Sequence, residues 1–160
     1  MNEAKNLDAI SSFRNEYFFL SNFYNCEINY RGISYQNTEA AFQAQKTMDQ
    51  NERRKFSTLN PSEAKRLGRH VKLRSDWEEV KEEEMYFIVL AKFMHYQSIR
   101  NKLMATWPAK LIEGNDWGDT CWGVCRGKGE NRLGQILMDI RERLLDLYSR
   151  DNFYEIRYLL

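Results

Sequence analysis

The clearest pattern of apolar and polar positions lies in the C-terminal quarter of the chain, where apolar residues recur every three to four positions. This period is typical of an amphipathic helix that buries one stripe and exposes the rest to water. It predicts a helix from about Asn131 to Tyr148. The apolar stripe consists of Leu133, Ile136, Leu137, Ile140, Leu144 and Leu147.

Three further helices are predicted between residues 60 and 106. Asn60-Pro61-Ser62-Glu63 combines a capping residue, a proline at the first helical position and a glutamate three residues after the asparagine. That helix should end near Gly68. A longer helix should run from Asp76-Trp77 to about Tyr96, and another from Ser98 to Thr106, before Pro108. In the longer helix, residues 81–84 should face water, opposite a stripe of Val80, Phe87, Ile88, Ala91 and Met94.

The N-terminal half carries the β signals. Residues 26–30 and 33–35 alternate around Arg31-Gly32, which predicts a short hairpin. Asn37 or Thr38 can cap a helix that runs to about Gln50. The polar residues 1–12 should be frayed, and residues 107–130 should be mostly loop with a brief strand at Leu111-Ile112. A loop of that length inside a compact domain is usually functional.

These elements predict a mainly helical α+β fold: one domain over residues 1–160, with a helical, bundle-like core and a small N-terminal β-hairpin. A chain of this length can bury one hydrophobic core without metal or disulfide support.

Composition narrows the class of protein. Aromatic residues make up 14% of the chain, and most are expected in the core, although a few rings can stack on a base. The net charge of +1 gives only weak long-range attraction to nucleic acid. The three cysteines do not form a disulfide pattern. With neither a membrane-length apolar run nor a signal peptide, we expect a cytoplasmic protein that does not enter the membrane.

One polar group on the predicted helix after the hairpin has catalytic potential. Glu39, Gln43 and Lys46 share a helix face beside Phe42. A stripe of this kind is most often exposed to solvent. The alternative is a site that cleaves a glycosidic bond, in which the carboxyl group acts on the leaving group and the amine binds an anion or attacks the anomeric carbon. Residues 113–123 offer a second carboxylate, although on composition alone turn-forming Asp and Gly beside a core Trp are the simpler explanation of that segment.

A glycine-rich stretch, residues 127–134, leads into the last helix and can bind phosphate at the helix N-terminus. An ordinary loop and cap is the simpler interpretation, because the spacing matches no nucleotide-binding motif. His70 and His95 have no nucleophile at motif spacing, so a hydrolase triad has no support.

Taken together, several collinear segments over residues 13–148 resemble the NADAR, or YbiA-like, family. The set is far more specific than any of its members. It comprises Phe19-Leu-Ser-Asn-Phe23, Tyr35-Gln-Asn-Thr-Glu-Ala-Ala-Phe-Gln-Ala-Gln-Lys46, Ala64-Lys-Arg-Leu-Gly-Arg69, Asp76-Trp77, Asp119-Thr-Cys-Trp-Gly123 and Gly129-Glu-Asn-Arg-Leu-Gly134.

The resemblance implies an N-glycosidase that cleaves the C1–N bond between ribose and a nitrogenous base. One branch of the family acts on riboflavin-pathway ribosylamino-pyrimidine phosphates, and another acts on ADP-ribosylated guanine in nucleic acid. The sequence does not choose between these substrates, and it gives no oligomeric state. A non-catalytic module that binds ADP-ribose or NAD is the alternative from another class.

The resemblance also implies roles for the matched residues. The predicted catalytic residues are Glu39, Trp77, Lys46 and Asp119. Lys46 would contact phosphate or ribose, or would trap the opened sugar as a Schiff base. Asp116 lies beside the motif but does not match it. The predicted substrate-binding residues are Phe19, Asn22, Gln43, Trp122, Gly123, Asn131 and Gly134. The residues present require no metal, and we expect no cofactor.

Overall fold

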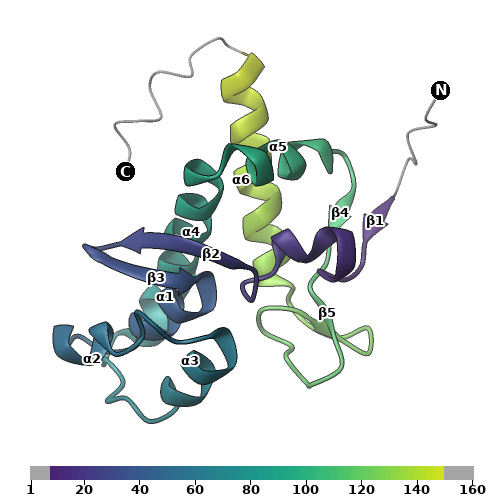
Figure 1. Ribbon diagram of the computed structural model, residues 1–160. Coiled ribbons are helices and arrows are strands. Elements are labelled where there is room, and N and C mark those ends of the chain that lie inside the picture. Colours follow the sequence, from purple (N-terminus) through teal and green to yellow (C-terminus); the bar gives the residue numbers. More distant parts are fainter. Residues whose placement is uncertain (1–7, 150–160) are drawn as a thin grey trace. The chain divides into compact units, whose positions relative to one another are not determined.

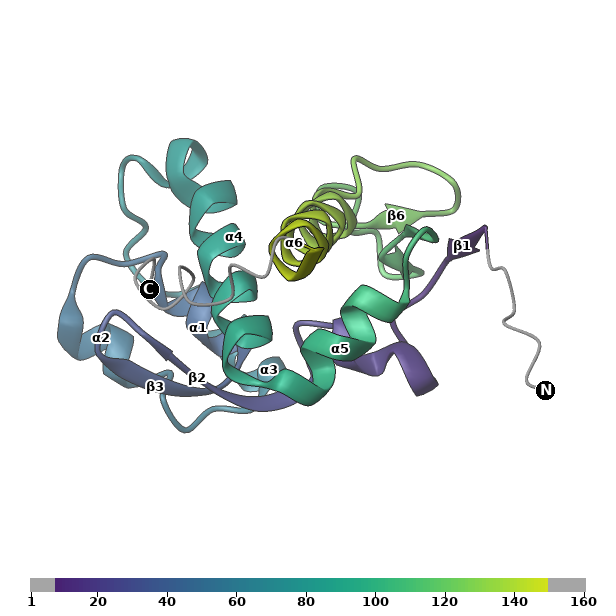
Figure 2. The same cartoon turned by 90° about the horizontal axis from the view of Figure 1, so that it is seen from above.

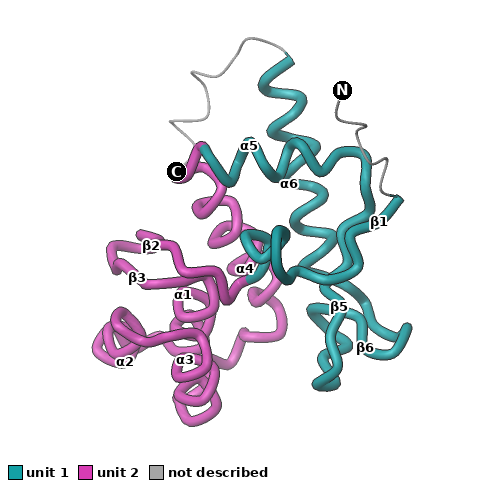
Figure 3. Tube along the Cα trace, turned by 45° about the vertical axis from the view of Figure 1, so that its right-hand side comes forward, with its two compact units in different colours: residues 1–21, 98–160 teal, residues 22–97 magenta. Residues whose placement is uncertain are grey.

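The computed structural model describes residues 8–149. The chain forms two compact units (Figure 3). Residues 22–97 make up one unit, here called the central unit. The flanking segments, up to Ser21 and from Ser98 onward, make up the other, here called the terminal unit.

The central unit begins with the predicted hairpin. Strands β2 (Asn25–Tyr30) and β3 (Ile33–Asn37) pair antiparallel, with Tyr30 opposite Ile33. The two residues between them, Arg31 and Gly32, have φ angles of 51° and 77°. Two successive positive φ angles match the right-handed twist of the strands, and glycine reaches them without steric cost. The hairpin prediction is therefore confirmed.

Helix α1 (Thr38–Ala44) follows the hairpin directly and is buried along its whole length. Asn37 caps it, since its side-chain oxygen accepts a hydrogen bond from Ala40 N at 2.8 Å. The predicted extension to Gln50 is wrong. In a continuous helix Gln50 N would bond to the carbonyl oxygen of Lys46, but this oxygen instead accepts from Arg74 N at 2.8 Å. A new helix, α2 (Gln50–Arg54), begins after its own cap.

Two more helices complete the central unit, and α1 contacts α2, α3, α4 and both strands. Helix α3 (Pro61–Leu67) has the predicted capping box and ends at Gly68. Helix α4 (Trp77–His95) also has the predicted bounds, and it packs on β2, beside the hairpin in Figure 2.

The buried face of α4 differs from the predicted stripe. Phe87 is 40% exposed. Glu84, predicted to face water, is buried because it pairs with two arginines. Lys92 is buried as well, with its amino group 5.4 Å from the ring centroid of Tyr24. The periodic pattern located the helix correctly, but it could not show that charged partners on other elements would bury Glu84.

The terminal unit holds the remaining elements, labelled in Figure 1 where space allows. They are β1 (Ala9–Ile10), η1 (Asn15–Leu20), α5 (Gln97–Ala105, which starts at the last residue of the central unit), β4 (Lys110–Leu111), β5 (Gly114–Asn115), β6 (Val124–Cys125) and α6 (Arg132–Ser149). Strands β1 and β4 pair in parallel, as do β5 and β6. The η1 segment is a 3-10 helix.

The two predicted helices are confirmed, and the brief strand lies at Lys110–Leu111, one residue before its predicted place. The predicted apolar stripe of α6 is buried except for Leu147, which is half-buried. The expectation that residues 1–12 are frayed is wrong for the part that the structure describes. Ile10 lies in β1 and is only 4% exposed, because it pairs with Leu111. Residues 1–7 lie outside the described range.

The described residues thus form a mixed, mainly helical fold, as predicted. Besides the predicted hairpin they contain two further two-stranded sheets, β1–β4 and β5–β6, which the sequence pattern did not predict. None of their helices combines the length and the apolar character that a membrane span requires.

Candidate functional site

The polar face of α1 is enclosed by protein. Glu39 is 7% exposed and Gln43 is 5% exposed, while Lys46, just beyond the helix, is half-buried. The solvent-exposed interpretation of this stripe is therefore wrong for Glu39 and Gln43. Burial of a carboxyl and an amide side chain is costly unless each finds hydrogen-bond partners, so their contacts indicate what the face can do.

Gln43 is the first such partner, and it lies one turn after Glu39. Its Nε2 donates a hydrogen bond of 2.8 Å to Glu39 Oε1. On the other side of this amide, α3 ends at Gly68. A Cβ atom at that position would lie 1.9 Å from Gln43 Oε1. Glycine is therefore required for the close approach of Gly68 to Gln43, and the two helices contact each other here.

Asn22 supports Glu39 from the segment before the hairpin. The carbonyl oxygen of Asn22 accepts from Glu39 N at 3.1 Å, and Asn22 Nδ2 donates to the sulfur of Met85 at 3.3 Å. Asn22 Oδ1 and Gln43 Oε1 are both buried and accept no hydrogen bond from the described residues. Buried acceptors of this kind fit a ligand that brings hydroxyl or amine donors.

Lys46 lies at the end of the same face. Its Nζ donates to the carbonyl oxygen of Gly68 at 3.4 Å. Burial lowers the pKa of Lys46; the nearby carboxylate of Glu39 partly opposes this change, and the cations Arg69 and Lys65 add to it. A lowered pKa increases the fraction of neutral amine, which is the nucleophilic form.

Trp77 opens α4 and lies against the same helix. Its ring centroid is 5.1 Å from that of Phe42, with an angle of 46° between the ring planes. Trp77 is 6% exposed, so protein atoms cover most of its surface. Phe42 lies between Glu39 and Gln43 in the sequence, so its ring contact places Trp77 against the helix that carries these two residues. Stacking of Trp77 on a substrate base stays a prediction.

An ion-pair cluster joins the hairpin turn and α4 to the loop that precedes Trp77. Glu84 Oε1 contacts Arg31 at 2.8 Å and Arg74 at 3.2 Å, and Glu84 Oε2 accepts from Tyr30 Oη at 2.8 Å. Arg74 also binds Asp76 at 2.6 Å. Burial, and then the hydrogen bond to Glu84, raise the pKa of Tyr30 to about 12. Because Arg74 N also donates to the carbonyl oxygen of Lys46, the cluster supports the chain at the end of the polar face of α1.

Asp119 lies in the terminal unit and organises its own loop. Its Oδ1 accepts from Cys121 N at 3.1 Å and from Trp122 N at 2.9 Å, and its backbone exchanges hydrogen bonds with Asn115. Oδ2 makes no hydrogen bond to the residues that the structure describes. Because Asp119 and Glu39 belong to different units, their pairing as two catalytic carboxylates stays a prediction.

Three predicted substrate-binding residues contribute to the packing of this loop. The side-chain amide of Asn131 makes two hydrogen bonds to the backbone. Its Oδ1 accepts from Glu113 N and its Nδ2 donates to the carbonyl oxygen of Leu111, each at 2.9 Å. A Cβ atom at Gly134 would lie 2.3 Å from that same carbonyl oxygen. Gly123 is equally constrained, since its Cβ would lie 2.3 Å from the carbonyl oxygen of Glu113. These contacts give the three residues a structural role in the loop. Their contact with a substrate stays a prediction.

The remaining predicted contacts of the terminal unit are aromatic. Trp122 is half-buried in the Asp119 loop. Phe19 is 5% exposed and lies under the amino group of Lys102, which is 5.8 Å from its ring centroid. Their contact with a substrate stays a prediction.

The central unit therefore brings together five of the predicted residues, namely Asn22, Glu39, Gln43, Lys46 and Trp77. Sequence reasoning missed Gly68, whose carbonyl oxygen binds Lys46, and the cations Lys65 and Arg69 beside it. A signal for them was present, because all three lie in a segment that supported the resemblance.

Comparisons with known proteins identify the family. Residues 10–145 match the NADAR domain. The chain belongs to the NADAR family. It is 41% identical over 133 residues to the N-glycosidase YbiA of Escherichia coli strain K12, which covers 81% of this chain and 82% of YbiA. The NMR structure of E. coli YbiA superposes with a TM-score of 0.79 at 37% identity and covers 89% of both chains.

A longer NADAR relative is the riboflavin biosynthesis protein VVA0006 of Vibrio vulnificus. It is 37% identical over 130 residues, which make up 79% of this chain but only 35% of that protein. With an N-glycosidase among its NADAR relatives, the chain is an enzyme: a hydrolase that acts on N-glycosyl bonds.

Proposed function

We propose that this NADAR enzyme hydrolyses the C1–N bond between a ribosyl group and a nitrogenous base. One observation carries the proposal: the buried carboxylate of Glu39 accepts a hydrogen bond from Gln43 and shares its helix face with the amine of Lys46. An enclosed carboxylate stabilises positive charge at C1 more strongly than one in water, because the local dielectric constant is lower.

In the proposed reaction, the C1–N bond breaks and its electron pair goes to the leaving nitrogen. Glu39 stabilises the oxocarbenium-like character at C1. Water then adds its oxygen to C1 and gives a proton to Glu39, which passes it to the nitrogen of the base. The products are free ribose, or its phosphate or ADP derivative, and the free base.

A covalent variant uses Lys46. Its neutral amine forms a bond to C1, and the C1–O bond of the ring and the C1–N bond to the base both break, each with its electron pair going to the departing atom. The two protons lost by the amine go to the ring oxygen and to the base nitrogen, so the opened sugar is held as a Schiff base and the free base leaves. Water then hydrolyses the C=N bond and releases the sugar and the amine. The lowered pKa of Lys46 supports this variant, because it raises the fraction of amine that can attack.

Two substrate types fit the chemistry: a riboflavin-pathway ribosylamino-pyrimidine phosphate and an ADP-ribosylated guanine in nucleic acid. The name of the Vibrio relative supports the first. The net charge of +1 also favours a small molecule over a polyanion, since little long-range attraction would bring nucleic acid to the protein. We therefore propose the pyrimidine phosphate as the main substrate.

A non-catalytic module for ADP-ribose or NAD is the second candidate. The aromatic residues and the free acceptors of Asn22 and Gln43 would serve it as well. The buried Glu39 argues for the enzyme, because a module that only binds an anionic ligand gains nothing from a carboxylate in its site.

The test is to incubate the purified protein with each substrate type and follow the products by mass spectrometry. The proposal predicts release of pyrimidine and ribose 5-phosphate from the pyrimidine compound. Tight binding of ADP-ribose without any base released from either substrate would support the module instead.

A further inference from the structure

The segment from residue 53 to residue 74 is strongly basic. It contains eight lysine and arginine residues and a single acidic residue, Glu63. Clusters of like charge destabilise a fold unless partners neutralise them, so the partner of each cation is informative. The cations are Arg53, Arg54, Lys55, Lys65, Arg66, Arg69, Lys72 and Arg74.

Several of these cations have structural partners. Arg74 binds Asp76 and Glu84, Arg53 donates to the carbonyl oxygen of Thr47 at 2.8 Å, and Lys55 pairs with Glu52 at 2.5 Å. Lys65 and Arg69, like Arg54, Arg66 and Lys72, form no ion pair with the residues that the structure describes; what distinguishes Lys65 and Arg69 is their position near Lys46. They lie four positions apart at the end of α3, so they are neighbours on one side of the helix end.

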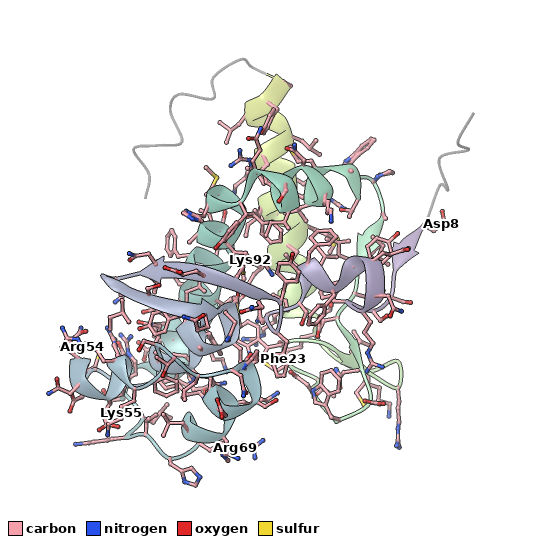
Figure 4. The ribbon with its side chains drawn as sticks, in the orientation of Figure 1. Asp8, Phe23, Arg54, Lys55, Arg69 and Lys92 are labelled. Atoms are coloured by element: carbon pink, nitrogen blue, oxygen red, sulfur yellow. The ribbon has the colours of Figure 1, made fainter. Side chains whose placement is uncertain are left out.

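Lys65 and Arg69 lie beside the polar face of α1, which holds Glu39, Gln43 and Lys46. The amino group of Lys65 is 6.0 Å from the ring centroid of Phe23, the residue after Asn22, whose carbonyl oxygen holds Glu39 N. Arg69 follows Gly68, whose carbonyl oxygen accepts from Lys46. Both cations lie close enough to Lys46 to lower its pKa. In Figure 4, Arg69 lies beside α3, whereas Arg54 and Lys55 lie at the end of α2.

Three cations therefore gather at one end of the face that holds Glu39. Their mutual repulsion would be relieved by an anion with several acceptor oxygens. A phosphate group has this chemistry, and on a ribosyl substrate it lies across the sugar ring from C1. With C1 at Glu39 and Lys46, the phosphate would extend toward Lys65 and Arg69.

We propose that Lys65 and Arg69 form the phosphate subsite of this enzyme. The subsite binds either the 5-phosphate of a ribosyl group or the diphosphate of ADP-ribose. This inference rests on the proposed function for the identity of the sugar. It gives a role to two cations that lie near Lys46 and form no ion pair with a described carboxylate.

The test measures binding rather than turnover, so it can fail independently of the proposed function. Calorimetry with ribose 5-phosphate, ADP-ribose and ribose is run on the wild type and on the double variant K65Q/R69Q. The double variant R54Q/K55Q removes the same charge from α2 and is the matched control. Thermal melting checks that both variants are folded.

We expect K65Q/R69Q to weaken the binding of at least one phosphorylated ligand about 10- to 100-fold, the loss of one or two hydrogen bonds to a charged group. The control should change this affinity less than about 2-fold, since exposed charges outside the site are screened. Comparing ribose 5-phosphate with ADP-ribose identifies the source of the phosphate. The proposal is overturned by equal losses in the two double variants, by an unchanged affinity in K65Q/R69Q, or by a wild type that binds neither phosphorylated ligand more tightly than ribose.

Discussion

Gln43 Nε2 donates a hydrogen bond of 2.8 Å to Glu39 Oε1 across one turn of α1, and both side chains are buried. This contact holds one oxygen of the Glu39 carboxylate in a fixed position on the helix. The predicted contact of Gln43 with ribose or base stays a prediction, and its buried Oε1 accepts no hydrogen bond from the described residues. The hydrogen bond adds a second hypothesis, that Gln43 positions Glu39.

Replacing Gln43 by methionine should lower kcat about 10- to 100-fold, because a hydrogen bond to a charged group contributes about 1.5–3 kcal/mol. Steady-state kinetics and thermal melting measure the effect. The control is Q45M. Gln45 is the buried residue that caps the C-terminus of α1, and its Nε2 donates to the carbonyl oxygen of Ala41 rather than to Glu39. We expect Q45M to reduce stability while kcat is retained. An equal loss of kcat in both variants would show that Gln43 acts only through the fold.

The pKa of Lys46 should lie below the usual lysine range, since burial disfavours the ammonium form. An NMR titration of ¹³C-labelled lysine side chains measures it, and K46R assigns the signal. As the pH rises through the lowered pKa, Lys46 loses its proton earlier than an ordinary lysine. If the reaction passes through a Schiff base, turnover should rise with pH over the same range.

Neighbouring charges give the titration an internal check. Glu39 favours the ammonium form, so E39Q should lower the pKa of Lys46 further. Lys65 and Arg69 disfavour that form, so K65Q/R69Q should raise it. If the pKa of Lys46 moves in neither variant, then Glu39, Lys65 and Arg69 do not lie close to its amino group as proposed.

Replacing Glu84 by glutamine should reduce the free energy of unfolding by about 3–5 kcal/mol, because Arg74 and Arg31 would lose their shared carboxylate. Denaturant unfolding measures this change. E83Q is the matched control at the neighbouring, exposed position of α4, where we expect a change within about 0.5 kcal/mol. Similar effects at the two positions would mean that the ion-pair cluster does not stabilise the central unit.

Local signals in the sequence predicted most elements of the fold. The Arg31-Gly32 turn and the Asn60-Glu63 capping box depend on neighbouring residues alone, so the pattern was sufficient. The end of α1 depends on Arg74, which lies 28 positions after Lys46 in the sequence and takes its carbonyl oxygen. No local pattern contains that information. The single-domain organisation stays a prediction, since it is not tested by the division into two compact units.

The candidate site was predictable in part, for a similar reason. Helical spacing placed Glu39, Gln43 and Lys46 on one face, but spacing alone favoured exposure to solvent. Burial of that face depends on α3 and α4, and the close approach of Gly68 is a contact between helices. The resemblance to NADAR proteins identified the candidate site residues. The structure adds the hydrogen bonds and charge interactions among the candidates that lie in the central unit.

The most direct measurement compares release of the free base by the wild type and by Glu39→Gln on the ribosylamino-pyrimidine phosphate. The side chains are nearly identical in shape, so circular dichroism and thermal melting should confirm an intact fold. We predict that turnover falls about 100-fold or more, as expected when a catalytic acid or base is lost. Turnover by the folded variant at the wild-type rate would contradict the central claim that Glu39 carries the chemistry.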